Sequence, residues 1–122
     1  HPSNCRPEWL IREMNRGVFY YLLEIEGRPI GCVGLEKIND DVCYLERLAV
    51  LPPMRRKGFG AMLVSRALAD ARRMKVHRVQ IGVIAEHLDL HDWYEKLGFE
   101  DVERKSFPQL VFPVVFMAYY FN

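Results

Sequence analysis

The pattern of apolar and polar positions predicts short strands and helices that follow one another closely along the chain. Stretches rich in aromatic and β-branched residues between turn-forming residues are typical of strands, and apolar residues at three- and four-residue steps are typical of amphipathic helices. In chain order we expect a helix at 7–16, strands at 18–25, 30–38 and 42–51, a helix at 58–74, a strand at 76–84, a helix at 87–97, and strands at 99–104 and 111–120.

Short turn signals indicate how these elements connect. Gly27-Arg28-Pro29 and Asn39-Asp40-Asp41 separate the first three expected strands, and links this short join antiparallel neighbours. Gly17 and Gly98 mark the expected ends of the first and last helices. The strand–helix–strand run between 42 and 84 implies a parallel crossover instead. The sheet is therefore expected to be mixed.

Residues 45–60 form the most informative stretch. A short apolar strand is stopped by Pro52 and Pro53, which cannot donate to a strand ladder, and a helix follows. Between strand and helix lie three cations and two glycines: Arg55, Arg56, Lys57, Gly58 and Gly60. A helix N-terminus presents unpaired N–H groups, and glycines let the backbone approach a phosphate closely. The loop is a candidate anion site; the alternative is a glycine-bearing turn beside a solvated basic cluster.

Two motifs resemble those of a known family. The spacing Arg55-x-x-Gly58-x-Gly60, between an apolar strand and a helix rich in alanine and leucine, resembles the acetyl-CoA loop of the GCN5-related N-acetyltransferases, the GNAT superfamily. Residues 93–100 (Trp-Tyr-Glu-Lys-Leu-Gly-Phe-Glu) resemble the family's second hallmark, which closes a helix and opens a strand. The motifs stand in the family's order with a strand between them, so the resemblance covers essentially the whole chain.

The resemblance implies a fold class. GNAT domains are α+β with α/β/α layering, in which a mixed, mostly antiparallel central sheet has helices on both faces. The expected elements match the family's order from its second helix onward, and the pattern lacks the family's additional N-terminal strand and helix. Residues 1–122 are expected to form a single GNAT-like acyl-CoA-binding acetyltransferase domain.

The resemblance also assigns residues to acetyl-CoA. The strand backbone at Leu48, Ala49 and Val50 would pair with the pantetheine arm, and one of its N–H groups would hold the acetyl oxygen. The pyrophosphate would lie on the basic loop, chiefly on backbone N–H groups, with the loop cations as further contacts. The loop residues assigned in this way are Arg55, Arg56, Lys57, Gly58, Phe59, Gly60 and Ala61.

Acetyl transfer from a thioester to an amine needs a base for the amine, a donor for the carbonyl oxygen and stabilisation of the leaving thiolate. Glu46 is the candidate base, because a carboxylate on an otherwise buried strand is costly unless it is paired or functional. Strand alternation places Tyr44 on the face of Glu46 and Arg47 on the opposite face. The alternative for Glu46 is a cross-strand salt bridge with Lys37 or Arg28.

Tyr94 is the candidate acid, and the resemblance also places it against the cofactor. Its hydroxyl would donate to the coenzyme sulfur as the tetrahedral intermediate collapses. The alternative is ordinary packing, since aromatic residues at helical spacing usually face a core. A covalent intermediate is not needed, and the sequence places no base beside Cys43 that would activate it as a nucleophile.

Two histidines lie near the start of the helix expected at 87–97. His87 stands where many GNAT relatives carry an asparagine that touches coenzyme A, and because imidazole can also form hydrogen bonds we retain it as a cofactor-binding candidate. His87 and His91 also have the i, i+4 spacing that can hold zinc. The glutamate of an H-E-x-x-H site is missing and no third ligand stands out, so we expect no metal.

Composition narrows the setting and the class of ligand. The formal net charge is +1 and the basic residues cluster only locally, which argues against a nucleic-acid surface. Three cysteines without metal-type spacing favour a reduced, cytoplasmic setting over a disulfide scaffold. No stretch is long and apolar enough to span a membrane, and no signal peptide is visible.

Two functions use the same loop. The first is an N-acetyltransferase that moves an acetyl group from acetyl-CoA directly to a primary amine of a small molecule or a protein, in a ternary complex. The second is a non-catalytic acyl-CoA-binding sensor or interaction domain. Glu46 and Tyr94 together favour the enzyme, whose acceptor the sequence does not identify. The aromatic tail 112–121 is either a core strand or an edge strand that could pair with a second subunit in a homodimer.

Overall fold

The computed structural model describes residues 6–15 and 17–122. Seven strands form one sheet, and two α-helices pack against it. In chain order the elements are β1 (Pro7–Asn15), β2 (Val18–Ile25), β3 (Arg28–Lys37), β4 (Val42–Val50), a 3-10 turn (Pro52–Met54), α1 (Phe59–Arg73), β5 (Arg78–Ile84), α2 (Leu88–Lys96), β6 (Glu100–Lys105) and β7 (Val114–Tyr120).

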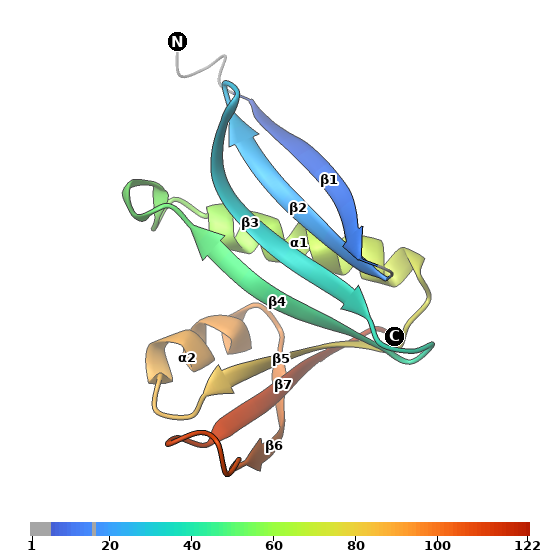
Figure 1. The fold of residues 1–122 in the computed structure, drawn as a ribbon, viewed down its shortest axis with the longest axis vertical. Helices are drawn as coiled ribbons and strands as arrows, with labels where there is room; N and C mark the ends of the chain where they lie inside the picture. Colours follow the sequence, from blue (N-terminus) through green and yellow to red (C-terminus); the bar gives the residue numbers. More distant parts are fainter. Residues whose placement is uncertain (1–5, 16) are drawn as a thin grey trace.

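The sheet has the strand order β1-β2-β3-β4-β5-β7-β6, and every neighbouring pair is antiparallel except β4 with β5. That parallel pair is short, because only Val42 to Tyr44 pair with Arg78 to Gln80. Beyond it the two strands diverge, as Figure 1 shows, and α2 lies beside the gap while α1 crosses behind β1–β4. The expected mixed, mostly antiparallel sheet is confirmed.

Both helices pack on the same face of the sheet. Cys43, Val79 and Tyr119 share that face because they pair across β4, β5 and β7. The sulfur of Cys43 lies 3.9 Å from that of Met74 at the end of α1. Tyr119 stacks edge-on against Phe99, which stacks in the same way on Tyr94 of α2. The core between helices and sheet includes Tyr21, Leu23, Val33, Leu35, Cys43, Leu63, Val64, Val79, Val83, Phe99 and Met117.

The first element differs from the sequence prediction. Residues 7–15 form the edge strand β1, antiparallel to β2, and not a helix that Gly17 would end. Trp9 faces α1, where the guanidinium of Arg66 lies 5.4 Å from its ring centre, while the alternate residue Leu10 stays exposed on the other face. Long-range pairing with the aromatic-rich β2 therefore outweighs a local pattern that also fitted a helix. The prediction is wrong here: four strands precede α1, and no described helix covers the second face.

The last strand is the core strand considered for the aromatic tail and not the edge strand considered as its alternative. β7 lies between β5 and β6 and pairs with both, so it is not a free edge that could add a second subunit.

Among the described residues, neither helix combines the length and the apolar composition needed to cross a membrane.

Candidate active site

Two clefts open where β4 and β5 diverge, and they meet at the side chains of Leu48 and Leu90. The first, here called the strand cleft, has a volume of about 430 Å³ and is lined by Tyr44, Leu45, Glu46, Arg47, Leu48, Gln80, Ile81, Gly82, Leu90, Tyr94 and Phe116. The second, the loop cleft, has about 370 Å³ and is lined by Leu48, Ala49, Val50, Met54, Arg55, Arg56, Gly58, Phe59, Gly60, Ala61, Leu90 and Trp93.

The loop cleft contains the N-terminus of α1. Gly58 caps the helix in the left-handed conformation, with φ of 85°, and no side chain bonds to the first N–H groups. No acidic residue lies in the first turn, so the positive end of the helix dipole is not neutralised there. The loop therefore has the donors and the charge that an anionic ligand needs.

The loop cations have different surroundings. The Nε of Arg55 donates to the carbonyl oxygen of Val50 over 3.0 Å and so ties the loop to the end of β4. Arg56 lines the cleft and has a positive φ of 64°. Lys57 does not line either cleft. Arg56 is consequently the cation of this loop best placed to contact a ligand.

Gly60 allows α1 and α2 to approach each other. A Cβ atom at this position would lie 3.2 Å from the ring of Trp93 on α2. A larger side chain here would press on the ring that forms the opposite wall of the loop cleft. The glycine spacing of the motif thus serves both the helix cap and the close contact of the two helices.

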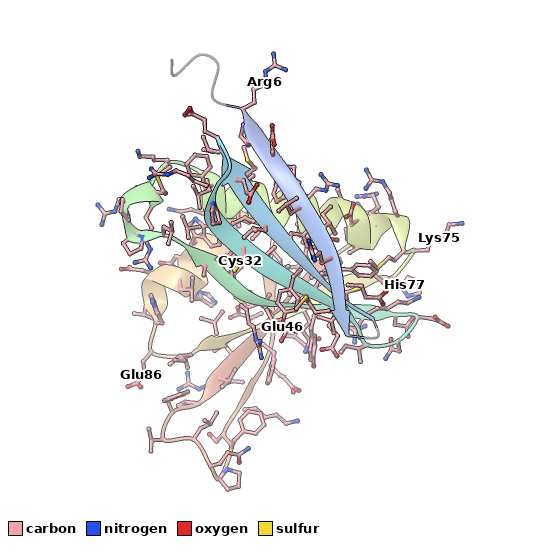
Figure 2. The ribbon with its side chains drawn as sticks, turned by 45° about the horizontal axis from the view of Figure 1, so that its top comes forward. Arg6, Cys32, Glu46, Lys75, His77 and Glu86 are labelled. Carbon is pink, nitrogen blue, oxygen red and sulfur yellow. The ribbon has the colours of Figure 1, made fainter. Side chains whose placement is uncertain are left out.

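Glu46 lies in the strand cleft on the face opposite α1. It pairs with Gly34 of β3, where a Cβ would lie 3.2 Å from the Cγ of Glu46 and 2.9 Å from the Tyr20 ring. Figure 2 labels Glu46 near the middle of the sheet, close to Cys32 of the neighbouring strand. Within the described residues Glu46 has no salt bridge, so the ion pairs considered with Lys37 and Arg28 are not formed.

A bulge in β4 changes the position of Arg47. The register between β3 and β4 shifts between Cys32 and Gly34, and Arg47 has a φ of 55°. Because a left-handed residue interrupts strand alternation, Arg47 does not point away from Glu46 as the sequence predicts. Both side chains line the strand cleft, together with Tyr44.

Tyr94 forms the opposite wall of the strand cleft, on α2. Its side chain is largely buried, between the edges of Trp93 and Phe99 at centroid distances of 4.9 and 5.4 Å. Burial raises the pKa of Tyr94 to about 12, so its hydroxyl stays protonated at neutral pH. No hydrogen-bond partner for this hydroxyl is found in the part of the chain that the structure describes. It is a neutral donor available to a ligand.

The other candidate side chains are placed less favourably. Cys43 is fully buried under α1, and burial raises the pKa of its thiol, which disfavours the nucleophilic thiolate. His87 caps α2 by accepting from the Leu90 N–H over 3.2 Å and lines neither cleft. His91 pairs with Asp101 of β6 over 2.6 Å. No cluster of potential metal ligands occurs among the described residues.

Some lining residues are not in the predicted site. Leu90 and Trp93 share a face of α2 with Tyr94 at three- and four-residue steps, a spacing that could have assigned them. Gln80 and Phe116 have no such signal, because their approach to the cleft depends on the pairing of β5 with β7 and on its divergence from β4.

Solved structures with this arrangement of strands and helices are acetyltransferases. An acetyltransferase of Bacillus subtilis in complex with CoA matches with a TM-score of 0.82 at 15% identity, over 96% of this chain and 100% of the other. A GNAT family acetyltransferase of Elizabethkingia anophelis with acetyl-CoA bound matches with a TM-score of 0.79 at 16% identity, over 87% and 78%. The fold is therefore that of the GNAT acetyltransferases.

The sequence itself also matches the family. A model described as the Acetyltransferase (GNAT) family matches residues 1–99. The chain belongs to this family, as its two motifs suggest.

Named relatives have similar sequences over part of their length. The chain is 31% identical over 90 residues to the uncharacterized N-acetyltransferase YjgM of Escherichia coli, covering 71% of this chain and 54% of the relative. It is 26% identical over 102 residues to the uncharacterized N-acetyltransferase MJ1207 of Methanocaldococcus jannaschii, covering 79% and 44%. The chain thus spans about half the length of these relatives.

Proposed function

We propose that this chain is an N-acetyltransferase that moves an acetyl group from acetyl-CoA directly to a primary amine of a small molecule or a protein. The observation that carries the proposal is the meeting of two clefts at Leu48 and Leu90. One contains the uncapped N-terminus of α1, which suits an anion, and the other contains a carboxylate and a protonated phenol, Glu46 and Tyr94. The acetyl-CoA and CoA bound to structures of the same fold support the choice of donor.

The donor would occupy the loop cleft and the free edge of β4. Its pyrophosphate would accept hydrogen bonds from the N–H groups at the start of α1, with Arg56 adding charge. From Leu45 to Val50, β4 has no described strand partner on the side that faces β5. The pantetheine amides can therefore pair with the backbone of Leu48 to Val50 as a further strand would. An N–H of this edge is then available to the acetyl oxygen.

Glu46 would receive the proton of the acceptor ammonium, directly or through a water molecule. The amine must be deprotonated because its lone pair attacks the acetyl carbon, and the ammonium group of a side chain such as lysine has a pKa of about 10. The carboxylate lies on the wall of the strand cleft and has no described salt-bridge partner. It is therefore free to accept a proton from a ligand in the cleft.

Tyr94 would donate a hydrogen bond to the coenzyme sulfur as the carbon–sulfur bond breaks. The raised pKa of the phenol, about 12, keeps the proton on oxygen while negative charge develops on sulfur. The thiolate is thus stabilised by a donor in a largely apolar wall, where such a bond is stronger than in water.

The first test is binding of the donor. Acetyl-CoA or CoA should raise the thermal midpoint of unfolding, because a ligand that binds only the folded chain stabilises it by mass action. Gly58→Val should remove this shift. Gly27→Val is a matched control, since Gly27 and Gly58 both have positive φ and neither has a neighbour within 4 Å of a Cβ. Equal loss of binding in both variants, or no binding by the parent chain, would contradict the cofactor site.

The second test is turnover. Release of free CoA thiol is measured with acetyl-CoA and a panel of primary amines. Amine-dependent release that follows saturation kinetics would support the enzyme. Binding of acetyl-CoA without release for any amine would instead favour the non-catalytic acyl-CoA-binding domain.

A further inference from the structure

A third hollow lies on the sheet face opposite the helices. This open-face pocket has a volume of about 480 Å³. It is floored by apolar side chains from β1 and β2 and edged by two guanidinium groups: Leu10, Met14, Tyr20, Leu22, Arg12 and Arg47. Leu10 and Met14 are 45% and 62% exposed, so this apolar surface is accessible to a ligand.

Arg47 connects the open-face pocket to the strand cleft, because it lines both. Neither Arg47 nor Arg12 forms a salt bridge with another described residue. Two unpaired guanidinium groups beside an apolar floor match a ligand that combines an anionic group with an apolar body.

The candidate base lies next to the open-face pocket. The Tyr20 ring and the Cγ of Glu46 lie 2.9 and 3.2 Å from the same point, the Cβ position of Gly34. Because Gly34 has no side chain, the Tyr20 ring, which is part of the apolar floor, can lie close to the side chain of Glu46. A single small ligand can therefore contact the floor, Arg47 and Glu46 together.

Charge narrows the class of acceptor. Glu46 is the one carboxylate among the described residues that line the strand cleft and the open-face pocket, and two arginines accompany it. A polyamine or an aminoglycoside would bring further ammonium groups against these arginines. Glu46 and Arg47 both line the strand cleft, so opposite charges lie close together on its wall. An α-amino acid carries its ammonium and its carboxylate on one carbon and could place each group against the opposite charge.

We propose, on the basis of the proposed function, that the acceptor is an α-amino acid with an apolar side chain. Its carboxylate pairs with Arg47, its amine faces Glu46, and its side chain lies on Leu10, Tyr20 and Leu22. In the reaction the amine nitrogen forms a bond to the acetyl carbon and the carbon–sulfur bond breaks. The amine proton passes to Glu46 or to water, and CoA leaves as the thiol. The product is an N-acetylated amino acid.

The test compares three acceptors with the full chain and saturating acetyl-CoA: L-phenylalanine, L-phenylalaninamide and phenethylamine. We expect kcat/KM for L-phenylalanine to be at least about tenfold higher than for the other two, because they lack the partner of Arg47. The amine of L-phenylalaninamide is less basic than that of L-phenylalanine and is deprotonated more easily. A higher fraction of free amine therefore cannot explain a preference for L-phenylalanine over the amide. Comparable use of the amide or of phenethylamine would overturn the inference.

Variants locate the source of the preference. Arg47→Asn removes the guanidinium and keeps a residue that tolerates positive φ. It should raise KM for L-phenylalanine about tenfold or more and reduce the preference over the amide to near unity. Arg28→Asn, at an exposed arginine that lines none of the three hollows, should keep the preference. A preference that survives in Arg47→Asn would overturn the role of Arg47.

Failure of this inference can be told from failure of the proposed function. If CoA raises the thermal midpoint and the kcat/KM for phenethylamine equals that for L-phenylalanine, the proposed acetyltransferase function stands and the amino-acid acceptor is wrong. If CoA has no effect on the midpoint, the cofactor site is wrong, and the amino-acid acceptor fails with it.

Discussion

The two halves of the sheet differ in the side chains that pack between strands and helix. In the half made of β1–β4 and α1, the buried side chains are mostly aliphatic, among them Leu23, Val33 and Leu63. The half made of β5–β7 and α2 contains a row of aromatic rings with successive centroids between 4.9 and 5.7 Å apart, namely Trp93, Tyr94, Phe99, Tyr119 and Phe121. Only three residue pairs join the halves at the sheet.

Each half has a largely buried tyrosine, and the two hydroxyls differ. The hydroxyl of Tyr21 donates to Asp70 on α1 over 2.8 Å, so it holds a helix to the sheet. The hydroxyl of Tyr94 has no partner in the described structure and lies at a cleft. The first half thus uses its polar group for stability, whereas the second keeps one available for a ligand. The short junction is what allows a cleft to open between them.

The largest expected effect comes from a substitution in the half made of β5–β7 and α2. Gly98 has a φ of 106°, and a Cβ here would lie 2.8 Å from the Tyr119 ring. Gly98→Val should therefore lower the free energy of unfolding by at least about 3 kcal/mol, through backbone strain together with overpacking. Gly27→Val has the strain of a positive φ without a neighbour and should lose only about 1–2 kcal/mol. Urea denaturation measures both, and equal losses would mean that the ring contact does not matter.

The next prediction separates chemistry from stability. Tyr94→Phe removes a hydroxyl with no described partner, so the unfolding free energy should stay close to that of the parent chain. Because the donor to the leaving sulfur is lost, kcat should fall about a hundredfold, or roughly 2.7 kcal/mol in the activation barrier. CoA thiol release and CoA titration measure turnover and binding. Unchanged turnover would remove Tyr94 from the mechanism.

Tyr21→Phe should behave in the opposite way. It removes the hydrogen bond to Asp70, and the free energy of unfolding should fall by about 1 kcal/mol. Asp70 keeps its ion pairs with Arg66 and Arg73, so its carboxylate is not left alone. Thermal or urea unfolding measures the loss, and CoA binding should persist. A loss of turnover with unchanged stability would contradict the division between the two halves.

The sequence predicts every expected element correctly except the first. From 18 onward each expected helix and strand is found within a few residues, because glycines, the Asn39-Asp40-Asp41 turn and the Pro52-Pro53 stop mark boundaries locally. β1 is mispredicted, since Trp9, Leu10 and Met14 are compatible with a helix until β2 is there to pair with them. Such an edge strand is determined by its neighbour and not by its own pattern.

The candidate site likewise combines residues that the sequence locates with one that it does not. The glycines of the loop and the 93–100 motif are local signals, and the structure brings them to adjoining clefts. Arg47 could not be placed from the sequence, because a non-glycine residue with positive φ gives no compositional signal. Its shift to the side of Glu46 follows from a bulge that exists only in the paired sheet.

The smallest expected effect concerns the contact of α2 with β6. The short hydrogen bond to Asp101 raises the pKa of His91, which sits one residue from the cleft residue Leu90. A group whose pKa is raised on folding stabilises the fold below its ordinary pKa, which is about 6.5 for histidine, and loses that contribution as pH rises through the folded value.

Asp101→Asn should therefore lower the free energy of unfolding by about 0.5 kcal/mol at pH 5.5, as for an exposed pair, and by almost nothing at pH 8.5. Asp92→Asn, at 3.4 Å from His91, is the control and should show a weaker dependence on pH. Urea denaturation of both variants at the two pH values measures the difference, and a loss in Asp101→Asn that grows with pH would contradict a charged His91 as the partner.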